Sequence, residues 1–422
     1  MEFDQSPEIK ALTERVRQFM RQEVYPAEKL YYEQELTATN RWTWQPVLRE
    51  LRAKAKAQGL WIFPLPKEVG GHGLSLLEYA PLAEAMSMSP IGAETFNCYT
   101  GTIWYAQLIH QHASPAARER YLPRLLGGEI RAAISITEPD VPGSDPTELK
   151  FEARREGNEY VLNGRKSWAT GSMQKECEIT LVLARTNPEA PRHARHSIII
   201  VPRHAEGLTV EGYDTIFGYD HAPYGHARLR FENVRVPVEN LLGREGEGFT
   251  LMQGGIGVGR VALGMGSLGA AERGLYEMCK WGDERVISGQ KLADRQVFSD
   301  AVARSRMEIN QFRACIMRTA WLIQKHGMKA ARSEVAQCKV LAPNMSLAVL
   351  DRAIQFLGGL GVSHERPLAE MYAYQRTVRI GEGADEVHRD LIARLELAQQ
   401  REARGVPAAG SAPARKDAPL GS

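Results

Sequence analysis

The feature that most restricts the fold of this chain is a change of hydrophobic period in its middle third. Six short segments rich in valine and isoleucine follow one another there, separated by turn residues. Apolar residues recur at helical spacing on both sides of this block, so helices are expected before and after it. The block holds no long helix-forming segment, which predicts antiparallel strands within an α+β fold. The six segments are Arg131–Thr137, Tyr160–Leu162, Ile179–Ala184, Ser197–Val201, Leu208–Glu211 and Ala227–Phe231.

Local signals mark several element ends. Ser6-Pro7 offers an N-cap with proline in the first helical turn, and Pro26 is expected to end that helix. Ser75-Leu-Leu-Glu78 is typical of a capping box. Ser114-Pro115 is expected to start another helix that Gly127-Gly128 ends. Within the β block, Asn163-Gly164 is typical of a hairpin turn.

These patterns predict three domains and a tail. We expect an N-terminal α-helical domain over residues 1–129, a middle antiparallel β domain over 130–241 and a C-terminal bundle of long helices over 242–400. Residues 401–422 are rich in Ala, Pro, Gly and charge, which predicts a disordered tail.

Composition excludes several functional classes. The 53 basic and 51 acidic residues nearly cancel, so nothing favours binding to nucleic acid. No stretch is apolar for long enough to span a bilayer, and no secretory or transit signal is visible, so we expect a cytoplasmic protein without integral membrane association. The five cysteines are scattered without a Cys-x-x-Cys motif and are expected to be reduced thiols.

Common catalytic motifs are missing or misplaced. Gly264-Met-Gly-Ser-Leu-Gly269 matches the dinucleotide pattern G-x-G-x-x-G, but it follows no strand and lies in a segment of helical period. Close helix packing is the favoured interpretation. The histidines and cysteines show no metal-ligand spacing, so we expect no metal. The absence of a Gly-x-Ser-x-Gly elbow gives a hydrolase triad little support.

Three further segments form a signature in combination. They are Ile134-Ser-Ile-Thr-Glu-Pro-Asp-Val-Pro-Gly-Ser-Asp145, Asn163-Gly-Arg-Lys-Ser-Trp-Ala-Thr-Gly171 and Arg379-Ile-Gly-Glu-Gly-Ala-Asp385. Each alone is an ordinary strand exit, strand or turn. The last places Glu382 between two glycines, where backbones approach closely and no neighbouring side chain blocks a ligand.

In this order, the segments resemble the acyl-CoA dehydrogenase family, over roughly residues 1–398. The resemblance implies a flavoenzyme that binds FAD non-covalently and removes two hydrogens from an acyl-CoA thioester, giving trans-2-enoyl-CoA. Glu382 would be the base that takes the α-proton, and flavin N5 would accept the β-hydride. The resemblance also implies an electron-transfer flavoprotein as electron acceptor and a homodimer or homotetramer.

The resemblance also assigns residues to the cofactor and the substrate. The flavin ring would lie against the loop Thr137–Ser144 and the strand Trp168–Thr170, with Thr170 at N5. Arg285 and Gln296 would reach the flavin of a neighbouring subunit, and Gln355-Phe-Leu-Gly-Gly359 would lie near its adenosine end. The complete cofactor set is Ser135, Ile136, Thr137, Gly143, Ser144, Trp168, Ala169, Thr170, Arg285, Gln296, Gln355, Phe356, Gly358, Gly359, Ala384 and Glu386. The substrate set is Ser144, Gly257, Val258, Gly259, Arg260 and Gly381.

Some positions depart from the family pattern. The loop after Thr137 is one residue longer than usual, and Gly381 stands where an aromatic residue often precedes the base. In one branch of the family the base comes from the helix that carries Arg260; here Gly259 holds that place and cannot act. The departures most resemble a subgroup found in animals fused to a kinase-like domain, which implies long, branched or hydroxylated acyl chains.

Two other functions remain open at this point. One is a flavin-dependent oxidase of the same fold, of the acyl-CoA oxidase or nitroalkane oxidase type, which reduces oxygen directly. The other is a helical scaffold without catalysis, for which the protein would stay colourless after FAD is added.

Overall fold

The first part of the chain is helical, and the signals in its sequence account for most helix ends. The structure is a computed structural model and describes residues 4–405. Ser6 caps the first helix, Ser75 and Glu78 form the expected capping box, Ser114 caps the last helix and Gly128 ends it with φ of 73°. These predictions are confirmed. The helices are α1 (Pro7–Phe19), α2 (Tyr25–Thr37), α3 (Pro46–Ala57), α4 (Leu76–Met86), α5 (Gly92–Thr95), α6 (Thr100–His112) and α7 (Pro115–Gly127).

The prediction that Pro26 ends the first helix is wrong. The chain passes from α1 through a π-helical turn, Met20–Val24, directly into α2, and Pro26 lies in the first turn of α2. Proline is tolerated in a first helical turn, and the π turn changes the hydrogen-bond register just before it. A helix boundary therefore falls near Pro26, but the chain remains helical across it.

The middle part is a sheet with two buried faces near its centre. Its strands are ordered β6-β7-β3-β2-β4-β5-β8, and β1 pairs with β4. In β5, Ile198 and Ile200 pack into the helical core while Ile199 and Val201 pack into a second core within the sheet. The strands are β1 (Arg131–Ser135), β2 (Glu152–Glu156), β3 (Glu159–Thr170), β4 (Cys177–Arg185), β5 (His196–Pro202), β6 (Leu208–Asp214), β7 (His226–Pro237) and β8 (Leu241–Leu242).

Two expectations for the sheet need correction. Strands β1 and β2 both pair parallel to β4, so the sheet is mixed, although its other pairings are antiparallel. Asn163-Gly164 forms no hairpin, because β3 runs straight through it with a register shift between Leu162 and Gly164. A Cβ on Gly164 would lie 2.8 Å from the ring of Phe151, so the glycine permits close packing at a bulge.

The last part consists of long helices. Helices α8 and α10 pack against each other, and α8 also packs on α4 and α9. Gly264 and Gly269 lie inside α8, where an added Cβ would come within 2.7 Å of Ile316 and 2.4 Å of Glu84 O. This confirms that the glycines serve helix packing. The elements are α8 (Gly248–Glu284), β9 (Val286–Ile287), β10 (Gln290–Lys291), α9 (Gln296–Ala330), α10 (Arg332–Leu357), α11 (Gly359–Val362), α12 (Leu368–Val378) and α13 (Asp385–Ala403).

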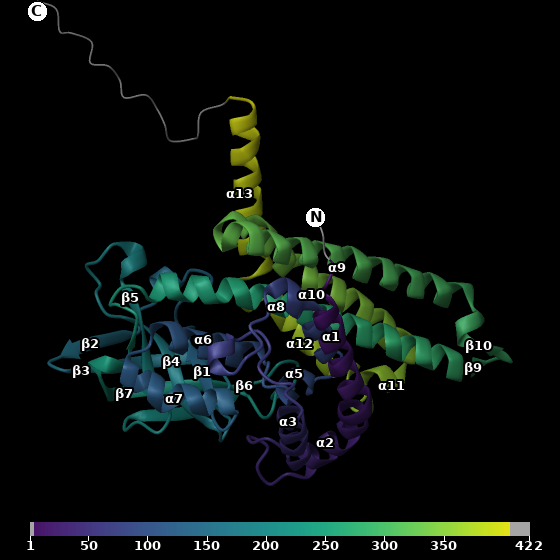
Figure 1. Cartoon of the computed structure of the whole chain (residues 1–422), viewed down its shortest axis with the longest axis horizontal. Coiled ribbons are helices and arrows are strands. Elements are labelled where there is room, and N and C mark those ends of the chain that lie inside the picture. The colour runs from purple at the N-terminus through teal and green to yellow at the C-terminus, as the bar shows by residue number, and fades with distance from the viewer. Residues whose placement is uncertain (1–3, 406–422) are drawn as a thin grey trace, which may run out of the picture.

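The long helices separate two regions of the molecule. Figure 1 shows the sheet at one end of α8 and the β9–β10 hairpin at the other, while α13 projects away from the bundle. Helix α13 continues to Ala403, so residues 401–403, which were expected to belong to a disordered tail, are helical. The rest of the predicted tail, residues 406–422, lies outside the described residues. All five cysteines carry free thiols.

Candidate active site

The loop between α12 and α13 holds Glu382 in an unusual backbone conformation. Two turns end α12, because the N–H groups of Ile380 and Gly381 both donate to Thr377 O at 2.8 Å. Glu382 then takes φ of 55°, a left-handed value that a residue with a side chain rarely adopts, and Gly383 follows with φ of 96°. Such conformations persist where the surroundings hold them in place, and they are frequent at active sites.

The Glu382 carboxyl group is buried beside cations without being hydrogen-bonded to them. Its Oε2 is buried and has no hydrogen-bond partner between residues 4 and 405. Burial raises the pKa of Glu382 to about 7, although the charges of Arg260 and Lys339 act in the opposite direction. Arg260 Nε donates instead to the main-chain oxygen of Glu382, at 3.0 Å. A Cβ on Gly259 would lie 3.5 Å from both carboxylate oxygens, so the carboxyl group faces a glycine of α8.

A cavity follows one face of α8 near this carboxyl group, although Glu382 itself is not among the residues that line it. Ala262, Leu263, Gly266 and Ala270 line it at helical spacing beyond Gly259. The rise from Gly259 to Ala270 corresponds to about 16 Å along the helix axis. Burial raises the pKa of two tyrosines that line the cavity, Tyr99 and Tyr374, and the nearby charge of Glu382 raises both further, so the carboxyl group lies close to this wall.

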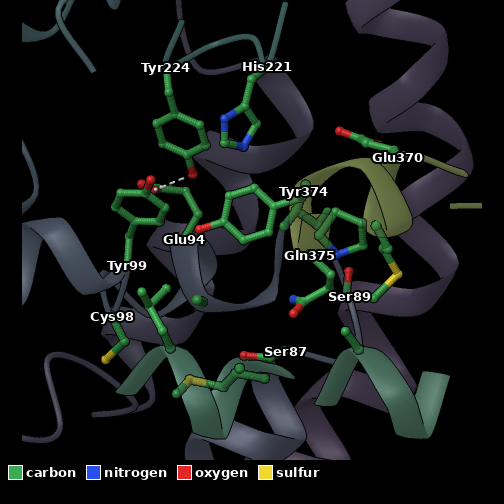
Figure 2. Close-up of a pocket in the computed structure, with 18 of the residues that line it drawn as sticks. Ser87, Ser89, Glu94, Cys98, Tyr99, His221, Tyr224, Glu370, Tyr374 and Gln375 are labelled. Atoms are coloured by element: carbon green, nitrogen blue, oxygen red, sulfur yellow. Dashed lines mark hydrogen bonds between the residues drawn. The ribbon is translucent and has the colours of Figure 1, made fainter. Parts of the chain in front are cut away.

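The cavity has a polar region as well as apolar walls (Figure 2). Glu370 lies one turn before Tyr374 on α12; burial raises its pKa to about 7, and it accepts a hydrogen bond from Tyr32 at 2.8 Å. Ser89 is buried, and its hydroxyl has no partner in the described part of the chain. His221 also lines the cavity, and burial lowers its pKa to about 3, so its imidazole is neutral. Hydrogen-bonding groups thus face a space bounded by aromatic rings and aliphatic side chains.

A buried charge cluster supports one wall of the cavity. Glu94, only 1% exposed, accepts hydrogen bonds from the guanidinium groups of Arg52 and Arg131 and from the Tyr224 hydroxyl at 3.0 Å (Figure 2). Tyr224 stacks on Tyr99, with ring centroids 4.6 Å apart. One carboxylate therefore balances two buried arginines directly behind the aromatic wall.

The sheet brings together the segments expected to hold the flavin ring. Ser167 N donates to Thr137 O at 2.9 Å, so the loop after β1 lies beside the end of β3. Trp168 has φ of 54° and is 47% exposed, although it belongs to a strand. Thr170 Oγ1 lies 2.9 Å from His226 Nδ1. An exposed indole next to a hydroxyl group offers stacking and hydrogen bonding, which fits the edge and face of a flavin.

Contacts that the sequence did not suggest support this region. Lys166 and Glu138 form a buried ion pair of 3.0 Å, and Glu138 also accepts from the N–H groups of Lys150 and Phe151. The carboxylate therefore ties both ends of the loop to β3. A second contact joins His226 to the cavity, because its Nε2 lies 3.3 Å from His221 Nδ1. For the ion pair between Lys166 and Glu138, the sequence offers only Thr-Glu-Pro after β1 and a lysine two residues before Trp168.

Several other expected cofactor residues lie at the end of the molecule away from the sheet, around β9, β10 and α11 (Figure 1). Arg285 and Gln355 are exposed, and a Cβ on Gly358 or Gly359 would meet no atom within 4 Å. Open glycines beside exposed polar side chains fit the close approach of a ligand. Within a single chain, these residues lie far from Trp168 and Thr170, at the other end of α8 (Figure 1). This end also includes Gln296 and Phe356.

The remaining candidates are divided between the two regions. Gly257 and Val258 lie on α8 just before Gly259, near the base, whereas Ser144 is exposed in the loop after Gly143. Ala384 caps α13 and Glu386 is exposed in its first turn. Ser135 donates to or accepts from Thr180 at 2.7 Å inside the sheet, and Ile136 and Ala169 flank the flavin segments. Gly381 does not line the cavity; a Cβ there would meet only Thr377 O, at 3.6 Å.

The described residues hold neither a metal-ligand cluster nor a membrane-spanning helix. No group of three or more His, Cys, Asp or Glu side chains between residues 4 and 405 is arranged to hold a metal ion. Within the same range no helix combines the length and apolar character needed to cross a membrane.

Comparison with known families assigns all three parts of the chain. Sequence models of the acyl-CoA dehydrogenase N-terminal, middle and C-terminal domains match residues 6–129, 133–234 and 246–397.

Individual relatives agree with these matches. The chain is 40% identical to "Probable acyl-CoA dehydrogenase FadE2" of Mycobacterium tuberculosis, over 95% of this chain and 98% of that protein. It is 40% identical to acyl-CoA dehydrogenase family member 11 of Gallus gallus, over 94% of this chain but only 52% of the chicken protein. A solved structure from Mycobacterium abscessus, assigned to the acyl-CoA dehydrogenases, is 39% identical with a TM-score of 0.90, over 94% of this chain and all of that chain.

Proposed function

Because the chain belongs to the acyl-CoA dehydrogenase family, we propose that it oxidises an acyl-CoA thioester to trans-2-enoyl-CoA with Glu382 as the catalytic base. The protein is an FAD-dependent oxidoreductase acting on acyl-CoA. The observation that carries the assignment of the base is a carboxyl group with a pKa of about 7, whose Oε2 is buried and unbonded, close to residues that line a cavity.

The site suits removal of a weakly acidic proton. The Cα–H of a thioester is far less acidic than a carboxylic acid, so its removal requires a placed base and exclusion of water. Burial makes Glu382 a stronger base than an exposed carboxylate, and its Oε2 is open to receive the proton. The Glu382 N–H is proposed to donate to the thioester oxygen and stabilise the charge that develops there. FAD supplies the acceptor for the hydride that leaves Cβ.

We further propose that FAD lies between two copies of the chain. The indole and hydroxyl of the sheet and the exposed Arg285 lie at opposite ends of one chain (Figure 1). A second copy would bring its Arg285 to the pyrophosphate, where a guanidinium can pair with two phosphate oxygens. The assembly is proposed to be a homodimer or homotetramer.

Arg285→Ala is expected to weaken FAD binding about ten- to a hundredfold, because a charged hydrogen-bonding pair is lost. The FAD dissociation constant and the flavin retained after gel filtration measure this. Arg21→Ala, which removes an exposed arginine of the N-terminal helices, is the matched control and should retain FAD. A monomer that binds FAD fully, with Arg285→Ala indistinguishable from it, would contradict the shared site.

The substrate is proposed to be a medium to long, or bulky, acyl chain, branched or hydroxylated. The cavity extends along α8 for about two turns, from Ala262 to Ala270. Ser89, Glu370 and His221 offer hydrogen bonds to a polar substituent. Each buried methylene adds about 0.8 kcal/mol to binding. The similarity to animal family members 10 and 11 supports the same subgroup.

A substrate panel tests this preference. We expect kcat/KM to be higher for octanoyl-, palmitoyl-, branched and hydroxylated acyl-CoA than for butyryl-CoA. Gly381→Tyr should leave the optimum unchanged, because Gly381 does not line the cavity and has open space around it. An optimum at butyryl-CoA in the unmodified protein would exclude a wide pocket.

The general function and the electron acceptor are tested together. Purified protein should show a flavin absorbance spectrum that anaerobic addition of a suitable acyl-CoA bleaches. We propose an electron-transfer flavoprotein as acceptor, so the reduced enzyme should react slowly with oxygen. Rapid reoxidation by oxygen would instead identify a flavin-dependent oxidase of the same fold, and a protein that stays colourless with FAD would reject both.

A further inference from the structure

A buried lysine lies behind the Glu382 loop. Lys339, on α10, is 1% exposed, and its ammonium group donates to two main-chain oxygens on either side of the base. One is Val378 O, at the end of α12, and the other is Gly383 O, 3.0 Å away. The lysine therefore bridges the start and the end of the turn that carries Glu382.

This bridge acts on a segment that is under conformational strain. Glu382 has φ of 55°, and a residue held in the left-handed region needs support from its surroundings. Arg260 and His388 both approach Glu382 O, at 3.0 and 3.2 Å, but neither reaches the flanking residues. Lys339 joins the two ends of the turn through main-chain oxygens, and the ion pair between Arg379 and Asp385 closes the same turn from outside.

The lysine also places a positive charge near the carboxyl group without bonding to it. Its hydrogen bonds go to carbonyl oxygens, so the lone pairs of the Glu382 carboxylate stay available for a substrate proton. A direct ion pair would stabilise the carboxylate more strongly, but it would occupy those lone pairs and weaken the base. The positive charge of Lys339 therefore favours the ionised form of Glu382 without occupying the oxygen that would take the proton.

We propose that Lys339 is a positioning residue for the acyl-CoA dehydrogenation, which fixes the turn of Glu382 and favours the ionised form of its carboxyl group. The inference rests on the proposed role of Glu382 as the base. Lys339, on α10, would thereby influence both the geometry and the charge state of a base that lies in the loop between α12 and α13.

The neighbours of Glu382 are consistent with this division of roles. From α8, Arg260 contributes a second positive charge; from α6 and α12, Tyr99, Tyr105 and Tyr374 face the carboxyl group, with the pKa of each raised by burial. Burial lowers the pKa of His388 to about 4, so it is neutral in the relevant range. Asp385 pairs with Arg379 at 2.8 Å. Burial lowers the pKa of Lys339 to about 8, which leaves it charged where Glu382 titrates.

Lys339→Met and Lys339→Arg separate charge from shape. Both are measured as FAD-loaded enzyme by the rate of flavin reduction with saturating octanoyl-CoA between pH 6 and 9.5. Lys339→Met should raise the apparent pKa of the rate profile by about one and slow the reaction about fivefold at pH 7, with recovery toward alkaline pH. Lys339→Arg, which keeps the charge, should restore most of the profile. Exposed Lys325→Met is the matched control and should change nothing.

An optical titration gives a readout that needs no turnover. Infrared difference spectra across the same pH range follow the protonated carboxyl band of Glu382, which is assigned by its loss in Glu382→Gln. The midpoint should move upward in Lys339→Met and return in Lys339→Arg. If the unmodified protein oxidises no acyl-CoA, the proposed function fails, but this titration still tests the effect of Lys339.

The contrary outcomes are distinct. A slower Lys339→Met enzyme with an unchanged apparent pKa and band midpoint would show a purely structural role and overturn the proposal. So would Lys339→Arg behaving like Lys339→Met in its pH midpoint. If Lys339→Met does not fold, the Lys339→Arg midpoint decides: a value near that of the unmodified enzyme supports the role of charge, and an upward shift overturns it.

Discussion

Glu382→Gln is expected to slow flavin reduction by acyl-CoA more than about ten-thousand-fold, while FAD and acyl-CoA still bind. Losing a general base costs about a hundred- to ten-thousand-fold, and the loss is larger where proton and hydride departure are coupled. The amide is nearly the same shape as the carboxyl group, and Oε2 has no hydrogen bond to lose, so the loop should keep its structure. Anaerobic stopped-flow absorbance measures reduction, and the perturbation of the flavin spectrum measures binding.

Glu370 provides the informative comparison, because it is a second buried carboxyl group whose pKa is raised to about 7. It already accepts a hydrogen bond from Tyr32, and it lies one helical turn before Tyr374, farther from Glu382 along the chain. Glu370→Gln should therefore change KM and substrate preference while costing far less of the reduction rate at saturation than Glu382→Gln. The reverse ranking of the two variants would assign the base to Glu370.

Glu94→Gln is expected to destabilise the protein by about 3–5 kcal/mol, the usual cost of leaving a buried charge without its partner. The variant leaves Arg52 and Arg131 buried side by side with no carboxylate between them. Burial lowers the pKa of Arg131 to about 9 even with Glu94 present, which shows how poorly this region tolerates positive charge. The midpoint of denaturant-induced unfolding, monitored with FAD bound, measures the change.

An exposed ion pair gives the control for this prediction. Glu129 lies 3.8 Å from Arg124 and its side chain is 65% exposed. Glu129→Gln should change the free energy of unfolding by less than about 1 kcal/mol, as is usual for surface pairs. Equal midpoints for the Glu94 and Glu129 variants would mean that the buried cluster contributes little.

The fold was predictable where it depends on neighbours in sequence. Caps at Ser6, Ser75 and Ser114 satisfy the first N–H groups of their own helices, so local sequence is sufficient to identify them. Pro26 and Gly164 were misinterpreted because their roles depend on a π turn and on the ring of Phe151. Parallel pairing of β1 with β4 depends on the path of the intervening chain, which periodicity does not report.

The residues of the site likewise divide into those that the sequence identified and those that only the structure reveals. Glu382 was found because its glycines and the two upstream segments carry a family resemblance. Lys339 had no such signal: its partners are main-chain oxygens about forty residues away, and one lysine within a helix is otherwise ordinary. The Glu94 cluster joins residues of three separate elements, and no spacing in the sequence links them.

The separation of the sheet from the β9–β10 hairpin along α8 has a thermodynamic consequence. If each cofactor site takes one half from each of two chains, ligand loading and assembly become linked equilibria governed by mass action. Dilution would release flavin even with every contact intact, and added FAD would draw free chains together. Substitutions at the hairpin would then weaken FAD binding to the neighbouring chain. The smallest assembly that holds a complete cofactor site would be a pair of chains.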